Sequence, residues 1–172
     1  STLEVWAREH ANTASVLCLG ERHDDAIRAF VAQQVLPRIN YQVLMLETSQ
    51  TQLQVMIESF EMGHRVNLLN ASLNGILAAA RAQVPVAARI VAIDELQNAS
   101  RSAPTRPSRE SLLVARIRSE WRAGQRYTVL FGALHCRAAP GWMMHRLIHE
   151  DARIERAGAM SAVILARYRE PS

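Results

Sequence analysis

The stretch VLCLGERHDD, residues 16–25, sets an apolar run directly against five ionisable side chains. Its first part is short, apolar and ends at Gly20, which is typical of a buried strand. Asp24 or Asp25 is placed to cap a following helix, because an aspartate oxygen accepts hydrogen bonds from the free amides of a first helical turn. We therefore expect a strand, a turn at Gly20 and a helix, with Glu21 and His23 at the exit of the strand.

Strand-length apolar runs and helical periods alternate along the rest of the chain. Strands are expected at residues 15–20, 41–47, 88–95, 126–132 and 160–170, with a loop at 97–108 and amphipathic helices between most of the strands. This alternation predicts an α/β fold with a central, mostly parallel sheet flanked by helices on both faces. The length of 172 residues and the lack of internal repeats favour a single domain over residues 1–172.

The basic residues have an unusual composition. All 20 of them are arginine, and the chain contains no lysine, although lysine is normally one of the commonest residues. Two explanations stay open. A GC-rich genome replaces lysine codons by arginine codons, or lysines were selected against because they accept ubiquitin in a eukaryotic cytosol. The second explanation is typical of toxins and effectors that act inside host cells.

Other bulk properties argue against several classes of protein. The net charge of +4 is too small to indicate a nucleic-acid partner, and no apolar run is long enough to span a bilayer. The chain starts at Ser1 without a basic and apolar leader, so we expect a fragment or a processed chain. Cys18 and Cys136 lie in apolar, strand-like runs, and we expect them to be free, buried thiols.

Four of the expected strands end in an acid or a histidine. These residues are Glu21 with His23, Glu47, Asp94 with Glu95, and His135. In α/β sheets, ligands bind outside the carboxyl ends of the strands, so residues far apart in sequence can meet there. A histidine at this edge can act as a base, and a carboxylate can orient it. The amides of Gly20 and Gly132 could face a developing negative charge.

A short pattern occurs twice at strand exits: GERH at residues 20–23 and GALH at 132–135, with LMLE at 44–47 between them. This set resembles the erythromycin esterase/ChaN-like superfamily, which includes the Tiki-type proteases. The resemblance implies a site made of His23, Glu47 and His135, with Glu21 beside it. The resemblance to the esterase-like members implies that His23 activates water. Tiki-like members imply that His23, Glu47 and His135 hold a divalent metal.

The resemblance also implies a function. The compact size and the lysine-free composition fit the branch that contains a plant-pathogen type III secreted effector, so we expect a hydrolase-like virulence effector that triggers host cell death. Its expected partners are a small-molecule or peptide substrate and a host protein. We expect no cofactor, with a divalent metal and then haem as alternatives. The expected location is the host cytosol, with the bacterial cytoplasm as the alternative. A non-enzymatic binding or recognition module, docking a partner or holding haem or a metal, is the competing interpretation.

Each candidate residue also has a purely structural interpretation. His23 could be a polar residue before a helix, and Glu47 the solvated end of a strand. Asp94 and Glu95 could cap backbone amides, and His135 could be a core histidine with satisfied hydrogen bonds. Three further groups of residues are expected to have structural roles. We expect His145 and His149 on the surface of a helix, and Met143 and Met144 in the core. We expect the arginines between Arg101 and Arg126 to form a solvated face, with binding of an anionic partner as the alternative.

Overall fold

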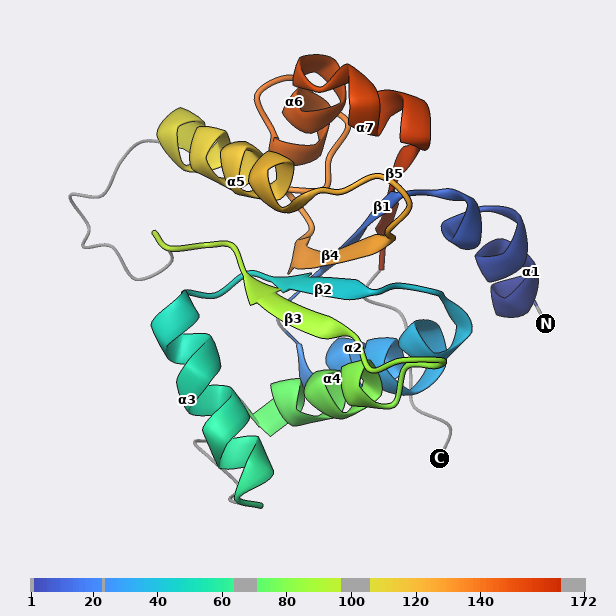
Figure 1. The fold of residues 1–172 in the computed structure, drawn as a ribbon, viewed down its shortest axis with the longest axis vertical. Coiled ribbons are helices and arrows are strands. Elements are labelled where there is room, and N and C mark those ends of the chain that lie inside the picture. Colours follow the sequence, from blue (N-terminus) through green and yellow to red (C-terminus); the bar gives the residue numbers. More distant parts are fainter. Residues whose placement is uncertain (1, 23, 64–70, 97–105, 165–172) are drawn as a thin grey trace.

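The computed structural model describes residues 2–22, 24–63, 71–96 and 106–164. Within these residues five strands form one parallel sheet in the order β3-β2-β4-β1-β5. The strands are β1 (Val16–Glu21), β2 (Val43–Leu46), β3 (Arg89–Ala92), β4 (Tyr127–Gly132) and β5 (Ala159–Val163). Helices pack on both faces of the sheet (Figure 1). The predicted α/β fold with a central parallel sheet is confirmed.

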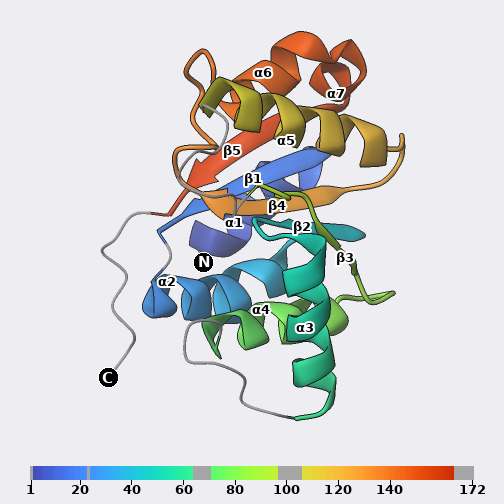
Figure 2. The same ribbon diagram turned by 90° about the vertical axis from the view of Figure 1, so that its left-hand side faces the viewer.

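The helices divide between the two faces by their order in the chain. The first face carries α1 (Thr2–Glu9), α2 (Asp25–Phe30), α3 (Gln50–Glu61) and α4 (Ala71–Arg81), and the second carries α5 (Arg106–Glu120), α6 (Met143–Glu150) and α7 (Ala152–Ala157). Figure 2 shows the sheet between α2, α3 and α4 on one side and α5, α6 and α7 on the other. Among the described helices, none has the length and apolar composition that a bilayer crossing needs.

Each face of the sheet has its own apolar core because successive strand side chains point in opposite directions. In β1, Leu17 and Leu19 join the core under α1 to α4, while Val16 and Cys18 join the core under α5 to α7. All six residues of β1 are buried. A strand buried on both sides reads as a continuous apolar run, which explains the VLCL pattern in the sequence.

The direction of winding reverses at β3. The chain passes from β1 to β2 and on to β3 along the first face, and then from β3 to β4 and on to β5 along the second. As a result β2 and β4 are neighbours in the sheet, but the segments that leave their carboxyl ends turn to opposite faces. Such a switch point, at the carboxyl edge of the sheet, is where ligands of open α/β sheets bind.

Two local expectations around β1 and β5 need correction. Gly20 does not make a turn, because β1 continues through Glu21 and Gly20 pairs with both neighbouring strands. A side chain at Gly20 would bring its Cβ within 3.0 Å of the Cα of Ala133, so close packing requires glycine there. The strand predicted at 160–170 begins at Ala159, as β5. Helix α7, which precedes it, was not predicted. Most of the predicted loop at 97–108 and the end of the predicted strand at 160–170 lie outside the described residues.

Asp24 is the N-cap of α2, as the sequence predicts. Its carboxylate accepts hydrogen bonds from the amides of Ala26, at 2.8 Å, and Ile27, at 3.2 Å. After α2 the chain continues through a π-helical turn, Val31–Val35, and a 3-10 turn, Leu36–Arg38, that contains Pro37.

Cys18 and Cys136 form a disulfide, which corrects the expectation of free thiols. Their Cα atoms are 5.7 Å apart although 118 positions separate them in the chain. Cys18 lies in β1, and Cys136 follows the neighbouring strand β4 and packs in the same core. The pairing follows from the adjacency of β1 and β4, which two isolated cysteines in a sequence do not reveal.

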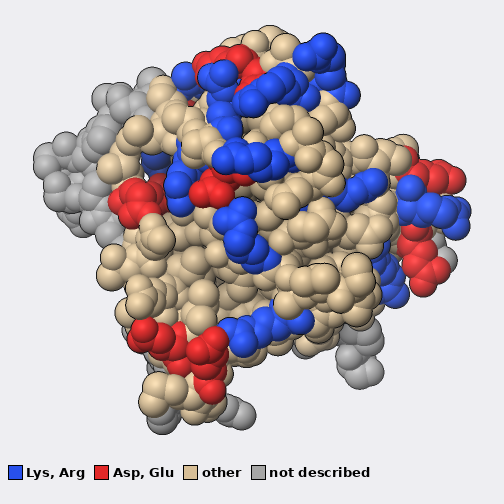
Figure 3. Space-filling model, viewed as in Figure 1, with Lys and Arg blue, Asp and Glu red and all other residues tan. Residues whose placement is uncertain are grey.

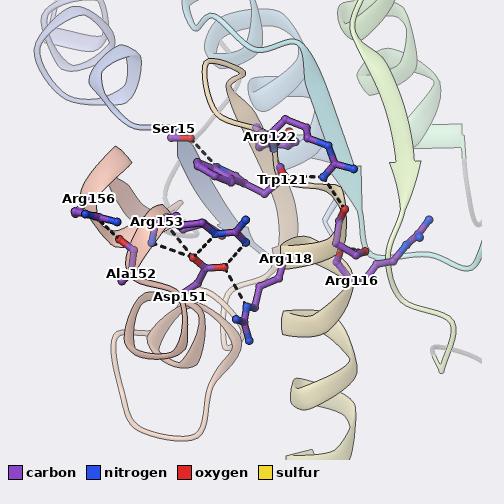
Figure 4. A network of polar contacts seen from close by, with 12 residues as sticks. Ser15, Arg116, Arg118, Trp121, Arg122, Asp151, Ala152, Arg153 and Arg156 are labelled. Carbon is purple, nitrogen blue, oxygen red and sulfur yellow. Dashed lines mark hydrogen bonds and ion pairs between the residues drawn. The ribbon is translucent and has the colours of Figure 1, made fainter.

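A buried carboxylate joins α5 to α7. Asp151 caps α7 by accepting hydrogen bonds from the amides of Arg153 and Ile154, and its other oxygen accepts one from Arg118 of α5 at 3.0 Å (Figure 4). The side-chain hydrogen bond from Arg153 is the largest of the effects that hold the pKa of Asp151 well below its usual range, and it outweighs burial, which acts in the opposite direction. Arg153 in turn lies over the ring of Trp121.

The arginines of α5 are largely paired with acids. Arg109 contacts Asp94 and Glu47, Arg116 contacts Glu120, and Arg118 contacts Asp151. Figure 3 shows arginines and acids interspersed over the region of the surface that α5, α6 and α7 form. This mixed surface agrees with the solvated face that the sequence predicts rather than with a uniformly basic patch. Arg101 lies outside the described residues.

Replacing both cysteines tests the disulfide. We expect the double substitution Cys18→Ala with Cys136→Ala to lower the free energy of unfolding by about 3–5 kcal/mol, because the cross-link restricts a long segment of the unfolded chain. Denaturant titration measures the change. A reductant should destabilise the wild type and leave the double variant unaffected. Two reactive thiols in the unfolded wild type, assayed without reductant, would contradict the disulfide.

Candidate functional site

The ends of β2 and β4 meet at the carboxyl edge of the sheet. Glu47 directly follows β2, and its Oε2 accepts a hydrogen bond from the amide of Gly132, the last residue of β4, at 3.2 Å. The Glu47 side chain is only 9 % exposed. A buried carboxylate needs such donors to offset the loss of water. Glu47 therefore bridges the carboxyl ends of the two strands.

His135 completes this cluster. Its Nε2 lies 3.2 Å from Oε1 of Glu47, and its Nδ1 lies 2.5 Å from Oε1 of Glu110. Glu110 is on α5 and is fully buried. The edges of the Phe131 and Trp142 rings pack around the imidazole, with ring centroids at 5.3 and 6.0 Å. The imidazole is thus fixed in position by two carboxylates and two aromatic rings.

The two carboxylates decide the protonation of His135. Burial by itself lowers the pKa of the imidazole, but the hydrogen bonds and negative charges of Glu110 and Glu47 outweigh it and raise the pKa from its usual 6.5 to about 9. Geometry leads to the same conclusion, because both ring nitrogens face carboxylate oxygens and must carry protons for both hydrogen bonds to form. At neutral pH His135 is therefore a cation that can donate a proton, rather than a base.

Arg109 extends the cluster to the end of β3. Its guanidinium forms an ion pair with Asp94 and lies 3.3 Å from Oε1 of Glu47. Asp94 is 1 % exposed, and its amide donates to the carbonyl of Thr48 at 3.0 Å. Asp94 thus takes part in the site through Arg109.

The remaining predicted residues have different surroundings. Glu21 ends β1 beside Gly132, its partner in the register, and its carboxylate accepts a hydrogen bond from Arg28 at 3.1 Å. Glu95 accepts a hydrogen bond from the amide of Gln50 at the start of α3, at 3.0 Å, so it has the capping role of its structural interpretation. His23 lies outside the described residues, and its predicted role stays a prediction.

The two glycines are engaged in the sheet and the cluster. Gly20 lies inside β1, where its missing side chain lets Ala133 and Cys136 approach. The amide of Gly132 donates to Glu47. The predicted role of both amides toward an oxyanion stays a prediction, and in this geometry the Gly132 amide binds a carboxylate.

The described part of the site is not a metal centre by itself, and the predicted set of His23, Glu47 and His135 stays a prediction because His23 lies outside the described residues. No group of three or more histidine, cysteine, aspartate or glutamate side chains among the described residues is arranged to hold one, and both nitrogens of His135 face carboxylates. His145 and His149 stack on each other at the surface of α6, with ring centroids 4.0 Å apart. Met143 and Met144 are buried in the core under that helix, as predicted, and are unsuited to contact a haem at the surface.

Sequence reasoning missed Glu110 and Arg109. A signal for Glu110 was present, because it stands in the apolar stripe of α5, in helical register with Leu113, Ile117 and Trp121. An acid at a core position of an amphipathic helix needs a buried partner. No pattern in the sequence singles out Arg109 from the other arginines around it.

The chain matches no protein-family model, and comparisons with curated proteins and with solved structures also found no match.

The raised pKa of His135 makes a prediction about stability. Because the pKa in the folded protein lies above that of the unfolded chain, protonated His135 stabilises the fold fully below about pH 6.5, and this contribution is lost as the pH rises through about 9. We expect the stability difference between wild type and His135→Gln to shrink over that interval. Urea titrations on both sides of it measure the difference, with His149→Gln as the control. A difference that is constant with pH would show that His135 does not carry the charge.

Proposed function

We propose that the protein is a hydrolase whose site lies at the carboxyl ends of β2 and β4. The observation that supports this proposal is His135 held between Glu47 and Glu110, next to the end of β4 at a switch point of the sheet. Paired carboxylates and an imidazole with a perturbed pKa are typical of acid–base sites. The resemblance of GERH, LMLE and GALH to the erythromycin esterase/ChaN-like superfamily supports the same class of reaction.

In the proposed reaction the residues have separate tasks. Protonated His135 donates from Nε2 to negative charge that develops on the substrate, or to the leaving group, when Glu47 gives up that hydrogen bond. Glu110 keeps the imidazole oriented, and Arg109 holds Glu47 in place. The base that activates water is His23, a role that rests on the resemblance alone. We assign no step to a metal, because the described residues do not fit one.

Substitution of His135 in the cluster, and of the predicted base His23, tests the hydrolase function. We expect His135→Gln to lower kcat for the substrate found in a screen of nitrophenyl esters and phosphoesters by about 10²–10⁴-fold, the usual contribution of a general acid or base. His23→Ala should cause a comparable loss. His149→Gln, which changes an exposed histidine of α6, is the matched control and should keep full activity. Folded protein that turns over none of these substrates faster than buffer would contradict the proposal.

We also propose that the hydrolase is a type III secreted virulence effector that acts in a host cell. The absence of lysine supports this role, because ubiquitin acceptor sites shorten the lifetime of a foreign protein in the host cytosol. The Cys18–Cys136 disulfide is a further constraint, because disulfides persist in oxidising compartments and are rare in the cytosol. Both cysteines are fully buried, and burial limits the access of reductants to the disulfide after delivery into the host cell. The disulfide is therefore compatible with action in the host cytosol.

Expression in plant leaf cells tests the effector role. We expect the wild-type chain to cause cell death, and His135→Gln and His23→Ala to abolish it at equal protein levels. His149→Gln should act like the wild type. Cell death that both His135→Gln and His23→Ala still cause would contradict an enzymatic effector and favour the recognition module that the sequence left open. No cell death from any of the chains would contradict the effector role.

A further inference from the structure

A cavity of about 340 Å³ lies between α5 and the residues that follow β3. Its walls are mainly aliphatic and are formed by Ile93, Leu96, Leu112, Leu113 and Ala115. Leu112 is 53 % exposed, so this wall of the cavity is open to solvent. The volume lies in the range of small-molecule pockets.

The charged side chains that line the cavity already have partners. Asp94 and Arg109 form an ion pair, and Arg116 forms another with Glu120 at 3.3 Å. The carboxylate of Glu95 accepts a hydrogen bond from the amide of Gln50. An ionised ligand group would have to displace one of these partners or leave its own charge uncompensated, which is costly away from water. The cavity therefore suits an uncharged, apolar group.

The cavity shares a wall with the candidate site. Arg109 lines the cavity, and its guanidinium lies 3.3 Å from Oε1 of Glu47. The same oxygen lies 3.2 Å from Nε2 of His135. Arg109 is thus a side chain that the cavity and the candidate site share.

We propose that this cavity is a subsite that holds the uncharged acyl chain of an ester substrate. The proposal rests on the hydrolase function and adds a substrate class to it. Each methylene group that enters the cavity should tighten binding roughly fourfold, as expected from the removal of apolar surface from water. Chains too short to reach past Arg109 should gain nothing from the cavity.

Two variants test the subsite by binding alone. Ala115→Phe places a ring into the cavity from an exposed position of α5, and Ala152→Phe makes the same change at an exposed position of α7 that does not line the cavity. The probes are 1-butanol, 1-hexanol and 1-octanol, followed by NMR of the methyl groups of Ile93 and Leu113. We expect affinity to rise with chain length in the wild type and in Ala152→Phe. Ala115→Phe should weaken 1-hexanol binding at least tenfold.

The same variants are then assayed with nitrophenyl acetate, butyrate and hexanoate. We expect kcat/KM to increase with chain length and Ala115→Phe to remove this increase. Binding of the alcohols without hydrolysis of any ester would establish an apolar binding site, but it would contradict the hydrolase function and with it the ester substrate. If kcat/KM changes neither with chain length nor with Ala115→Phe, the subsite is overturned and the hydrolase function is still supported. Methyl shifts confined to other parts of the protein would also overturn the subsite.

Discussion

The imidazole of His135 lies between the carboxylates of Glu47 and Glu110, and this contact joins the end of β2, the segment after β4 and helix α5. All three groups are nearly or fully buried. Charges can be buried in this way only when they are paired, and loss of one partner from a buried pair typically costs about 3–5 kcal/mol. The packing of α5 on the carboxyl edge of the sheet therefore depends on keeping this cluster complete.

The sheet and the disulfide place the cluster. Reversal of the winding at β3 makes β2 a neighbour of β4, so that Glu47 reaches the amide of Gly132. Cys136, the residue after His135, is bonded to Cys18 in β1, which fixes the backbone next to the imidazole. Gly20 lets this segment approach β1 closely. Residues that do no chemistry themselves thus determine where His135 lies.

Much of the architecture could be predicted from the sequence, because buried parallel strands read as short apolar runs, as β1, β2 and β4 do. The edge strands β3 and β5 are only partly buried. Helix α7 was missed because six residues are too few to show a helical period. In the site, Glu47 and His135 could be predicted because each lies just beyond the carboxyl end of a strand. Their meeting with Glu110, the Arg109 bridge and the Cys18–Cys136 bond could not, because each depends on which strands are neighbours and on which face α5 packs.

His135 and Glu110 stabilise each other inside the protein. A double-mutant cycle of His135→Gln, Glu110→Gln and the combined variant, followed by urea unfolding at neutral pH, measures this coupling. A buried, charge-assisted hydrogen bond predicts a coupling free energy of about 1.5–3 kcal/mol. Additive effects, with a coupling below about 0.5 kcal/mol, would show that the two side chains do not stabilise each other.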